Sequence, residues 1–117
     1  MRVECTPRQY SVRVYDDGKE TNYSSSCQVF RYGDRAEVYS IIGRGFYAAM
    51  PLVFAEIEKA GCKTLEGYVS KAHARLLRMK GKHWGLTAEI TGEGELDGHK
   101  LVWIVVQRVK EELVRGG

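Results

Sequence analysis

The chain has 117 residues, of which 44% are hydrophobic and 28% are charged, and its formal net charge is +3. A chain of this length and composition is expected to fold as a single soluble domain over residues 1–117, with its own apolar core. The slight positive charge argues against nucleic-acid binding. No apolar run approaches the roughly 18 residues that a membrane span needs, so a membrane partner is not expected either.

Cysteine and histidine usage points away from metal and disulfide chemistry. The three cysteines, Cys5, Cys27 and Cys62, lack the paired spacing of metal sites and disulfide frameworks. The three histidines fall on separate predicted elements and form no ligand pair. The N-terminus has no secretory-signal pattern. We therefore expect reduced thiols, no metal site and a cytoplasmic location.

Three strands come first in the predicted order. Residues 10–15 alternate polar and apolar side chains, and residues 27–32 and 35–42 form two further strands around a Gly-Asp turn. In the last of these, alternation places Ser40 on the core-facing side. Its apolar end at Ile42 is typical of a strand near the centre of a sheet, which is buried on both faces.

Helical spacing dominates residues 46–60. Pro51 lies inside this segment and would cost about 3 kcal/mol in a helix interior. The helix therefore either begins near Met50, with the proline in its first turn, or is kinked at the proline. Gly61 is predicted to end it. The apolar stripe consists of Phe46, Met50, Val53, Phe54 and Ile57.

A strand, a helix and two strands complete the chain. Residues 63–69 are predicted as a strand, and residues 71–80 as a helix that Ser70 caps and Gly81 ends. The inward residues of this helix are expected to be Ala72, Leu76 and Met79. The last two strands are residues 83–91 and 99–108.

The predicted order is β-β-β-α-β-α-β-β. This order indicates an α/β fold (α+β, with a mixed sheet). The strand-helix-strand unit in the middle implies a parallel pair with a right-handed crossover, and the flanking hairpins are antiparallel. Helices are expected to pack on the faces of the resulting mixed sheet. Residues 110–117 are charged, end in Gly-Gly, and are expected to be frayed or a short helix.

This order, together with the segment from Gly61 to Gly81, resembles the fold of the acyl-CoA N-acetyltransferases (GNAT fold). The resemblance covers residues 10–108 and begins at the second strand of the family fold. It implies a GNAT-like sheet in which the first strand and the usual two N-terminal helices are missing or reduced.

The resemblance implies a cofactor-binding segment between the third strand and the first helix. The family carries Arg/Gln-x-x-Gly-x-Gly/Ala there, and backbone N–H groups with the helix N-terminus hold the pyrophosphate of CoA. The matching residues are Ile42, Gly43, Arg44, Gly45 and Phe46. The two glycines are kept, but their spacing to the arginine is not. The alternative is a plain strand-to-helix turn without a ligand.

The family's proton donor has no counterpart in this sequence. The family helix carries Asn-x-x-Ala-x-x-x-Tyr, and its tyrosine protonates the departing thiolate. The resemblance matches these positions to Ser70 and Leu77, and a leucine cannot donate a proton. The usual general acid is therefore predicted to be absent, and the site to be degenerate.

Two neighbouring strands supply the remaining candidates for acid and base chemistry. Glu37 and Tyr39 lie on the third strand, and Glu66 and Tyr68 lie on the fourth. Carboxylates on adjacent strands suit proton transfer, but a strand glutamate facing water has the same pattern. Glu37, Glu66 and Tyr68 are thus weak catalytic candidates.

The second predicted helix carries an unusual number of basic residues. They are Lys71, Arg75, Arg78, Lys80 and Lys82. A solvated helix face explains such a pattern, and the alternative is contact with phosphate or with an acidic partner.

The resemblance favours a non-catalytic GNAT-like protein similar to small phage-encoded internal virion proteins. Such a protein binds another protein in virion assembly or host interaction, in the host cytoplasm or the virion, without a cofactor. One alternative is an acetyl-CoA-dependent N-acetyltransferase with a shortened acceptor site. Another is a small inhibitor that docks on a host protein. Whether the chain is an enzyme is left open, leaning to no. Exposed strand edges, at residues 10–15 or the last hairpin, offer a route to homo-oligomers.

Overall fold

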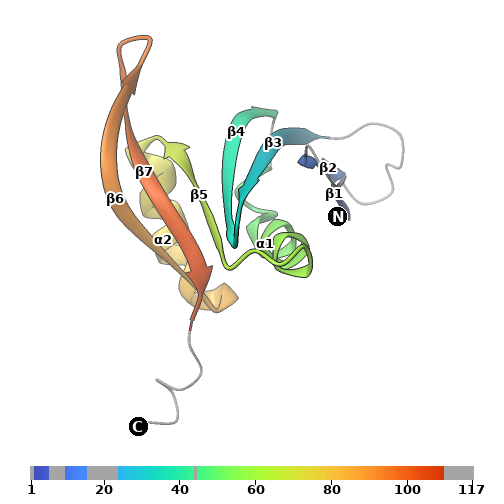
Figure 1. The fold of residues 1–117 in the computed structure, drawn as a ribbon. Helices are drawn as coiled ribbons and strands as arrows, with labels where there is room; N and C mark the ends of the chain where they lie inside the picture. Colours follow the sequence, from blue (N-terminus) through green and yellow to red (C-terminus); the bar gives the residue numbers. More distant parts are fainter. Residues whose placement is uncertain (1, 6–9, 16–23, 44, 110–117) are drawn as a thin grey trace, which may run out of the picture.

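The computed structural model describes residues 2–5, 10–15, 24–43 and 45–109 (Figure 1). The expected fraying of residues 110–117 lies outside the described residues. The elements in chain order are β1 (Arg2–Cys5), β2 (Tyr10–Tyr15), β3 (Ser25–Tyr32), β4 (Arg35–Gly43), α1 (Met50–Lys59), β5 (Thr64–Val69), α2 (Lys71–Trp84), β6 (Leu86–Leu96) and β7 (His99–Arg108).

The described strands form one seven-stranded sheet in the order β1-β2-β3-β4-β5-β7-β6. β4 and β5 are parallel, as the strand-helix-strand unit predicts, and all other neighbours are antiparallel. The mixed α/β class is confirmed. The predicted order lacked β1, which pairs with β2 from Arg2 opposite Tyr15 to Cys5 opposite Val12. Four residues are too few for alternation to identify a strand.

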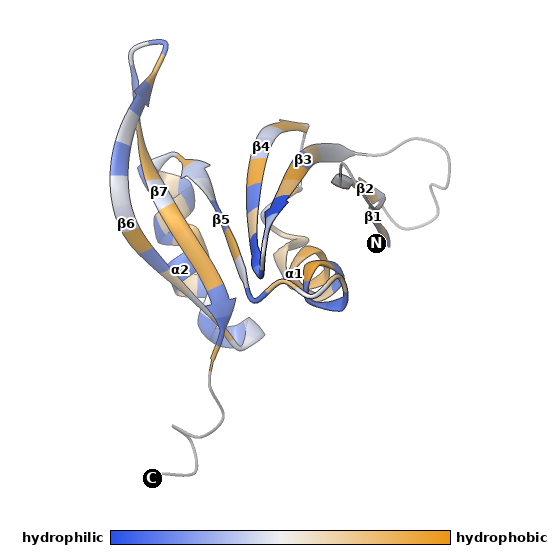
Figure 2. Cartoon of the chain, in the orientation of Figure 1, coloured by the Kyte–Doolittle hydropathy of each residue, from blue (hydrophilic) through white to orange (hydrophobic). Residues whose placement is uncertain are grey.

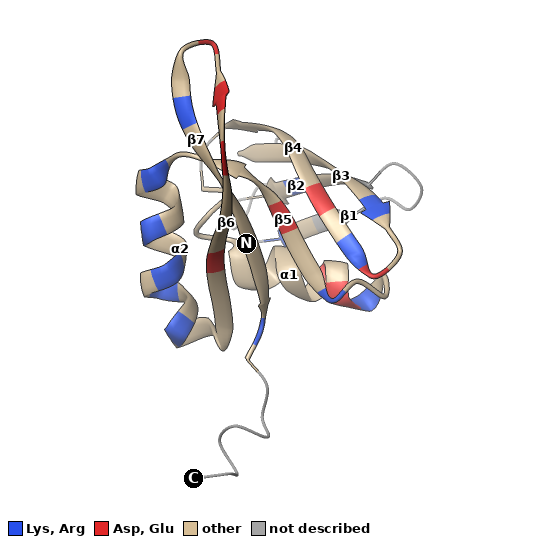
Figure 3. Cartoon of the chain, turned by 60° about the vertical axis from the view of Figure 1, so that its left-hand side comes forward, with Lys and Arg blue, Asp and Glu red and all other residues tan. Residues whose placement is uncertain are grey.

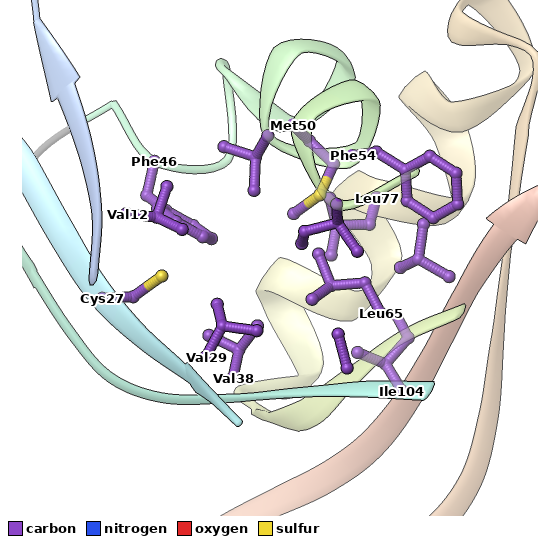
Figure 4. Packing of buried hydrophobic residues seen from close by; sticks show 14 of the residues in the cluster. Val12, Cys27, Val29, Val38, Phe46, Met50, Phe54, Leu65, Leu77 and Ile104 are labelled. Atoms are coloured by element: carbon purple, nitrogen blue, oxygen red, sulfur yellow. The ribbon is translucent and has the colours of Figure 1, made fainter. Parts of the chain in front are cut away.

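Both helices pack on the same face of the sheet. One cluster of buried side chains joins Met50 and Phe54 of α1 and Leu77 of α2 to Val38, Leu65 and Ile104 of the central strands (Figure 4). β7 is hydrophobic over most of its length (Figure 2), in keeping with its place between β5 and β6 inside the sheet. Among the described residues no helix precedes α1, so no described helix covers the opposite face of the sheet.

The proline in the first helix marks its beginning. α1 starts at Met50 with Pro51 in its first turn, which confirms the first of the two predicted alternatives. All five residues of the predicted apolar stripe are buried. Gly61 follows the helix with a φ of +93°, a conformation that favours glycine. The Arg31 side chain donates a hydrogen bond of 2.7 Å to the carbonyl oxygen of Ala60, the C-cap of α1.

The prediction for the second helix was wrong in its end and in its buried face. α2 continues through Gly81 to Trp84, and Gly85 ends it with a φ of +71°. The residues expected inward, Ala72, Leu76 and Met79, are exposed. The buried ones are Ala74, Leu77 and Gly81. Small residues face the sheet because the helix backbone comes very close to β6 there. The helix thus occupies the first residues of the predicted strand 83–91, and β6 runs from 86 to 96 instead.

Gly81 marks the closest approach. A Cβ atom at this position would lie 2.8 Å from the backbone oxygen of Leu86, which is shorter than real Cβ contacts. We predict that Gly81→Ala destabilises the fold by about 1–3 kcal/mol, although alanine favours helix by about 1 kcal/mol over glycine. Urea unfolding measures the effect, with exposed Lys80→Ala as the control. A stabilised Gly81→Ala variant would contradict the close packing.

An ion pair ties the end of β7 to α1. Arg108 donates hydrogen bonds of 2.6 Å and 2.9 Å to the two carboxylate oxygens of Glu58. Its guanidinium also lies over the Phe54 ring, 5.4 Å from the ring centroid. This paired geometry lowers the pKa of the Glu58 carboxyl. The Arg108 side chain is 47% exposed and that of Glu58 is 35% exposed, so solvent screening limits how much this ion pair stabilises the fold.

The Glu58–Arg108 pair predicts a specific acid dependence of stability. The folded pKa of Glu58 lies below its unfolded pKa, so the pair stabilises the fold above the ordinary carboxyl pKa. That contribution is lost as the pH falls through the folded pKa. We expect Glu58→Gln to cost roughly 0.5–1 kcal/mol at pH 7 and much less near pH 3, measured by urea unfolding. Glu56→Gln, which affects a more local ion pair with Lys59, is the control. A cost that is the same at both pH values would argue against the pair.

Candidate functional site

The two central parallel strands separate soon after they meet. β4 and β5 pair only from Arg35 opposite Thr64 to Glu37 opposite Glu66. Beyond this point β4 contains a bulge. Gln28 of β3 lies opposite Tyr39 and Ser26 lies opposite Ile42, so β4 advances by three residues where β3 advances by two. Ser40, in the bulge, has a φ of +55°. A bulge bends its strand, so β4 turns away from β5 here.

The bulge overturns two predictions for the end of this strand. Ser40 is exposed rather than core-facing, and the Ile42 side chain is 67% exposed rather than buried. An extra residue in the strand reverses the alternation that follows it, so the pattern that holds for Ala36 and Val38 fails after Tyr39. The apolar end of β4 therefore lies at a surface.

A cleft of about 590 Å³ occupies the space between the separated strands. This volume is within the usual range for small-molecule sites. β4, the ends of β5 and α2, the turn before α1 and the last hairpin line it. The lining residues are Val38, Tyr39, Ser40, Ile41, Tyr47, Tyr68, Val69, Ser70, Gly94, Glu95, Leu96 and Leu101. A small apolar pocket of about 20 Å³ adjoins the cleft and reaches Met50 and Leu77 of the two helices.

Two glycines set the width of the cleft. A Cβ atom at Gly67 would lie 2.9 Å from the backbone oxygen of Val38, where β4 and β5 begin to part. A Cβ atom at Gly94 would lie 2.7 Å from the Tyr68 ring, which packs edge-on against Trp103 with centroids 4.8 Å apart. Larger residues at either glycine would displace a wall of the cleft.

The predicted cofactor segment lies at one end of the cleft, but its residues play different parts. Gly43 has a φ of +97° and no room for a side chain, because a Cβ atom would meet the backbone of Ser24. Gly45 has a φ of +83° and no atom within 4 Å of a Cβ. Phe46 is 2% exposed and belongs to the core, so its bulk points away from this end. Arg44 lies outside the described residues.

An aromatic stack lies beside the cleft, between the turn before α1 and the first turn of α2. Tyr47 and His73 lie parallel, with ring centroids 4.1 Å apart and an angle of 11° between the rings. Burial raises the pKa of Tyr47. Nδ1 of His73 lies 2.8 Å from the hydroxyl of Ser70, which also accepts a hydrogen bond from the His73 backbone N–H as the N-cap of α2. The predicted N-cap role of Ser70 is confirmed, whereas sequence reasoning missed Tyr47 and Ser70 as cleft residues.

The candidate acid and base residues lie along the uncovered face of the sheet. Glu37 and Glu66 face each other across β4 and β5, and Arg35 bridges them at 3.0 Å and 3.9 Å. The Tyr39 hydroxyl donates to a carboxylate oxygen of Glu37 at 2.5 Å. This hydrogen bond raises the pKa of Tyr39 to about 12. Tyr39 thus connects the cleft with Glu37.

Glu66 is held in place by its neighbours. Only 9% of it is exposed, and its two carboxylate oxygens accept hydrogen bonds from Nε1 of Trp103 at 3.1 Å and from the Thr64 hydroxyl at 2.9 Å. Tyr68, by contrast, is 47% exposed and lines the cleft. Of the three weak catalytic candidates, Tyr68 is therefore the one with direct access to a ligand in the cleft.

The described part of the chain offers neither a metal site nor a membrane-spanning helix. No group of three or more His, Cys, Asp and Glu residues there could hold a metal ion. None of its helices has the length and apolar character needed to cross a membrane. Cys27 and Cys62 are buried and belong to no disulfide, and burial raises the pKa of Cys62.

The Trp103–Glu66 hydrogen bond predicts a measurable cost on removal. Trp103→Phe keeps an aromatic ring against Tyr68 but leaves a nearly buried carboxylate without one of its donors. We expect a loss of about 1–3 kcal/mol in the free energy of unfolding, measured by urea denaturation. Tyr68→Phe, which keeps the ring contact and removes a half-exposed hydroxyl, is expected to change stability by less than about 0.5 kcal/mol. Equal effects of the two changes would show that the Glu66 hydrogen bond contributes little.

Comparison with known proteins gives matches in structure but not in sequence. No protein-family model matches the sequence, and no curated protein matches it closely enough to serve as a relative. Solved structures do match, at low sequence identity. TofI, in a ternary complex with an inhibitor and MTA, has a TM-score of 0.65 at 12% identity, over 85% of this chain and 64% of TofI. The chain thus spans just under two thirds of the length of TofI.

Two further structures carry names that mention CoA. MesI, a CoA-dependent acyl-homoserine lactone synthase, has a TM-score of 0.61 at 11% identity, over 87% of this chain and 63% of MesI. A Bacillus subtilis acetyltransferase in complex with CoA has a TM-score of 0.54 at 11% identity, over 87% of this chain and 78% of the enzyme. At such identities the likeness concerns the fold alone. The seven-stranded mixed sheet and the strand order of this chain thus make up a GNAT-like fold.

Proposed function

We propose that the chain is an acyl-CoA-dependent N-acyltransferase whose donor binds in the cleft between β4 and β5. The observation that carries the proposal is the separation of two parallel strands at the bulge of Ser40, which leaves strand edges facing a cleft of about 590 Å³. The pantetheine arm of CoA is a linear chain with two amide groups. Such a chain suits a gap between strand edges, because it pairs with their backbone groups as an added strand does.

The turn between β4 and α1 suits the pyrophosphate of the donor. Space is open around Gly45, and no side chain caps the N-terminus of α1, where Ala49 is the N-cap. The N–H groups of Ala49, Met50 and Leu52 already donate to backbone carbonyl oxygens, so the dipole of α1 and the open space at Gly45 are what favour a phosphate at this end. The resemblance to the acyl-CoA N-acetyltransferases implies the same segment, Ile42 to Phe46, as the candidate cofactor site. Of these residues Phe46 would contribute its backbone only, since its side chain is buried.

The chemistry needs an amine, a thioester and two proton movements. The amine nitrogen attacks the acyl carbon, the C–N bond forms, the C–S bond breaks, and the thiolate takes a proton. Tyr68 lines the cleft and is the candidate donor of that proton. The hydroxyl of Tyr39 is the candidate acceptor of the amine proton, because it can pass its own proton to Glu37 along their 2.5 Å hydrogen bond. Holding amine and thioester together supplies much of the remaining rate.

The non-catalytic hypothesis from the sequence rests on one structural observation. Leu77, which matches the family's tyrosine, is 3% exposed and part of the core, so that position offers no proton to a ligand. The comparisons lend no support to a bacteriophage origin, a virion role or a host-directed inhibitor, and the MesI and Bacillus subtilis neighbours are named as enzymes. Those finer hypotheses, with the host cytoplasm or virion as location, stay predictions. They share the expectation that the chain binds no CoA.

Calorimetric titration with acetyl-CoA tests the proposal. We expect micromolar binding by the wild-type chain and loss of binding, by roughly tenfold or more, in Gly45→Glu, because a carboxylate at the turn repels the pyrophosphate. Gly33→Glu is the matched control. Gly33 also has a positive φ, +65°, and no atom within 4 Å of a Cβ, but it lies at the β3–β4 turn.

The outcomes distinguish the acyltransferase proposal from the non-catalytic hypothesis. Binding that Gly45→Glu abolishes and Gly33→Glu leaves unchanged would support the donor site, and release of free thiol from acetyl-CoA in the presence of amines would then test turnover. No heat of binding at millimolar acetyl-CoA would overturn the acyltransferase proposal and favour a protein partner.

A further inference from the structure

One flank of α2 carries a continuous stripe of positive charge. Lys71, Arg75, Arg78 and Lys82 follow one another at i, i+4, i+7 and i+11, and all four are exposed. The helix contains no acidic residue (Figure 3). None of the four makes an ion pair with a described residue. We refer to these four residues as the cation stripe.

Two apolar side chains of α2 are exposed. Leu76 is 37% exposed and Met79 is 63% exposed, although both are on a helix that packs against the sheet. Met79 lies beside the cation stripe, whereas Leu76 lies further round the helix, toward Lys80. A purely solvated helix face explains charges but does not explain an exposed Met beside them. A surface that mixes an apolar centre with a charged rim is the usual composition of a protein interface.

The cation stripe lies on the flank of α2 away from α1. Each helical residue is turned by about 100° from the one before, which places His73 roughly opposite the stripe. The His73 ring stacks on Tyr47, in the turn before α1, so that flank faces α1. The stripe therefore faces the side of β6, which is the last strand at that edge of the sheet.

The same edge carries a projecting acidic hairpin. The tip of the β6–β7 hairpin, residues 93–100, extends beyond the rest of the described molecule (Figure 1) and is defined as the arm. Glu93, Glu95 and Asp97 are exposed on it, together with Lys100, which lies opposite Glu95 across the hairpin. Leu96 is 63% exposed. Lys71 borders a hollow shared with Glu93 and Glu95, whereas the rest of the stripe runs along α2 away from its own arm.

We propose that the chain forms a twofold homodimer in which the arm of each copy lies along the cation stripe of the other. In this arrangement Glu93 and Glu95 of one copy meet Arg75 and Arg78 of the partner copy. The apolar arm residue Leu96 lies near the exposed Met79 of the partner copy. A basic helix and an acidic arm at one edge of the molecule are self-complementary under a twofold axis, as a closed dimer requires.

The alternatives fit the surface less well. Nucleic acid would match the cations but not the exposed Leu76 and Met79, and the net charge of the chain is only +3. An anionic membrane would need a broader apolar face, with large residues that enter the lipid, than these two side chains provide. A second copy matches both the charge and the apolar residues with groups that are already present in the chain.

Analytical ultracentrifugation of the purified chain tests the dimer. We expect a concentration-dependent dimer in low salt whose dissociation constant rises in high salt, because partly exposed ion pairs are screened. The double variant Arg75→Glu/Arg78→Glu makes the stripe on α2 acidic, so that it faces the acidic arm of the partner copy. The double variant Glu93→Lys/Glu95→Lys makes the arm basic, so that it faces the basic helix of the partner copy. Each double variant alone is expected to lose the dimer by about tenfold or more.

Mixing the two double variants makes the test specific. In a heterodimer the acidic arm of the first meets the basic helix of the second, and the basic arm of the second meets the acidic helix of the first. The mixture is therefore expected to recover the dimer that each variant has lost. Lys80→Glu, on the other flank of α2, is the control and should dimerise like the wild type, and circular dichroism checks that all variants are folded. A monomeric wild-type chain at about 100 μM in low salt, or a folded mixture that stays monomeric, would overturn the proposal.

Discussion

The parting of β4 from β5 is the constraint on which the site depends. Parallel strands need a crossover, and α1 supplies it on one face of the sheet while the strands stay paired only at Arg35–Glu37. The bulge at Ser40 then bends β4 away. A single irregularity thus opens a cleft in the middle of the sheet, where both walls are strands supported by neighbours. Such walls hold a ligand more rigidly than loops do.

Close approaches at glycines fix how the other elements surround that cleft. Gly67 lets β5 pass the backbone of Val38, Gly81 lets α2 settle onto β6, and Gly94 lets the hairpin rest against the Tyr68 ring. A Cβ atom at any of these three glycines would lie less than 3.0 Å from the nearest atom of the neighbouring element. The width of the cleft and the position of α2 are therefore set by missing side chains as much as by the apolar core.

Sequence patterns predicted the elements better than their faces. Pro51 located the start of α1, and the apolar run at residues 101–106 marked β7, because both signals are local. The buried face of α2 could not be read from hydrophobicity, since close packing selects Ala74 and Gly81 over the larger Leu76 and Met79. From the sequence, the candidate residues were Ile42 to Phe46 for a cofactor and Glu37, Glu66 and Tyr68 for catalysis, and of these Tyr68 lines the cleft. The cleft itself follows from the bulge, which no residue type signals reliably.

The two proposals meet at the β6–β7 hairpin. Gly94, Glu95 and Leu96 line the cleft, and all three belong to the arm that the proposed dimer would hold on its partner. A projecting two-stranded hairpin has little support of its own beyond the sheet. Contact with a second copy would restrain it and so restrain one wall of the cleft against Tyr68. Ligand affinity and dimer formation would then be linked, and each would strengthen the other by the same factor.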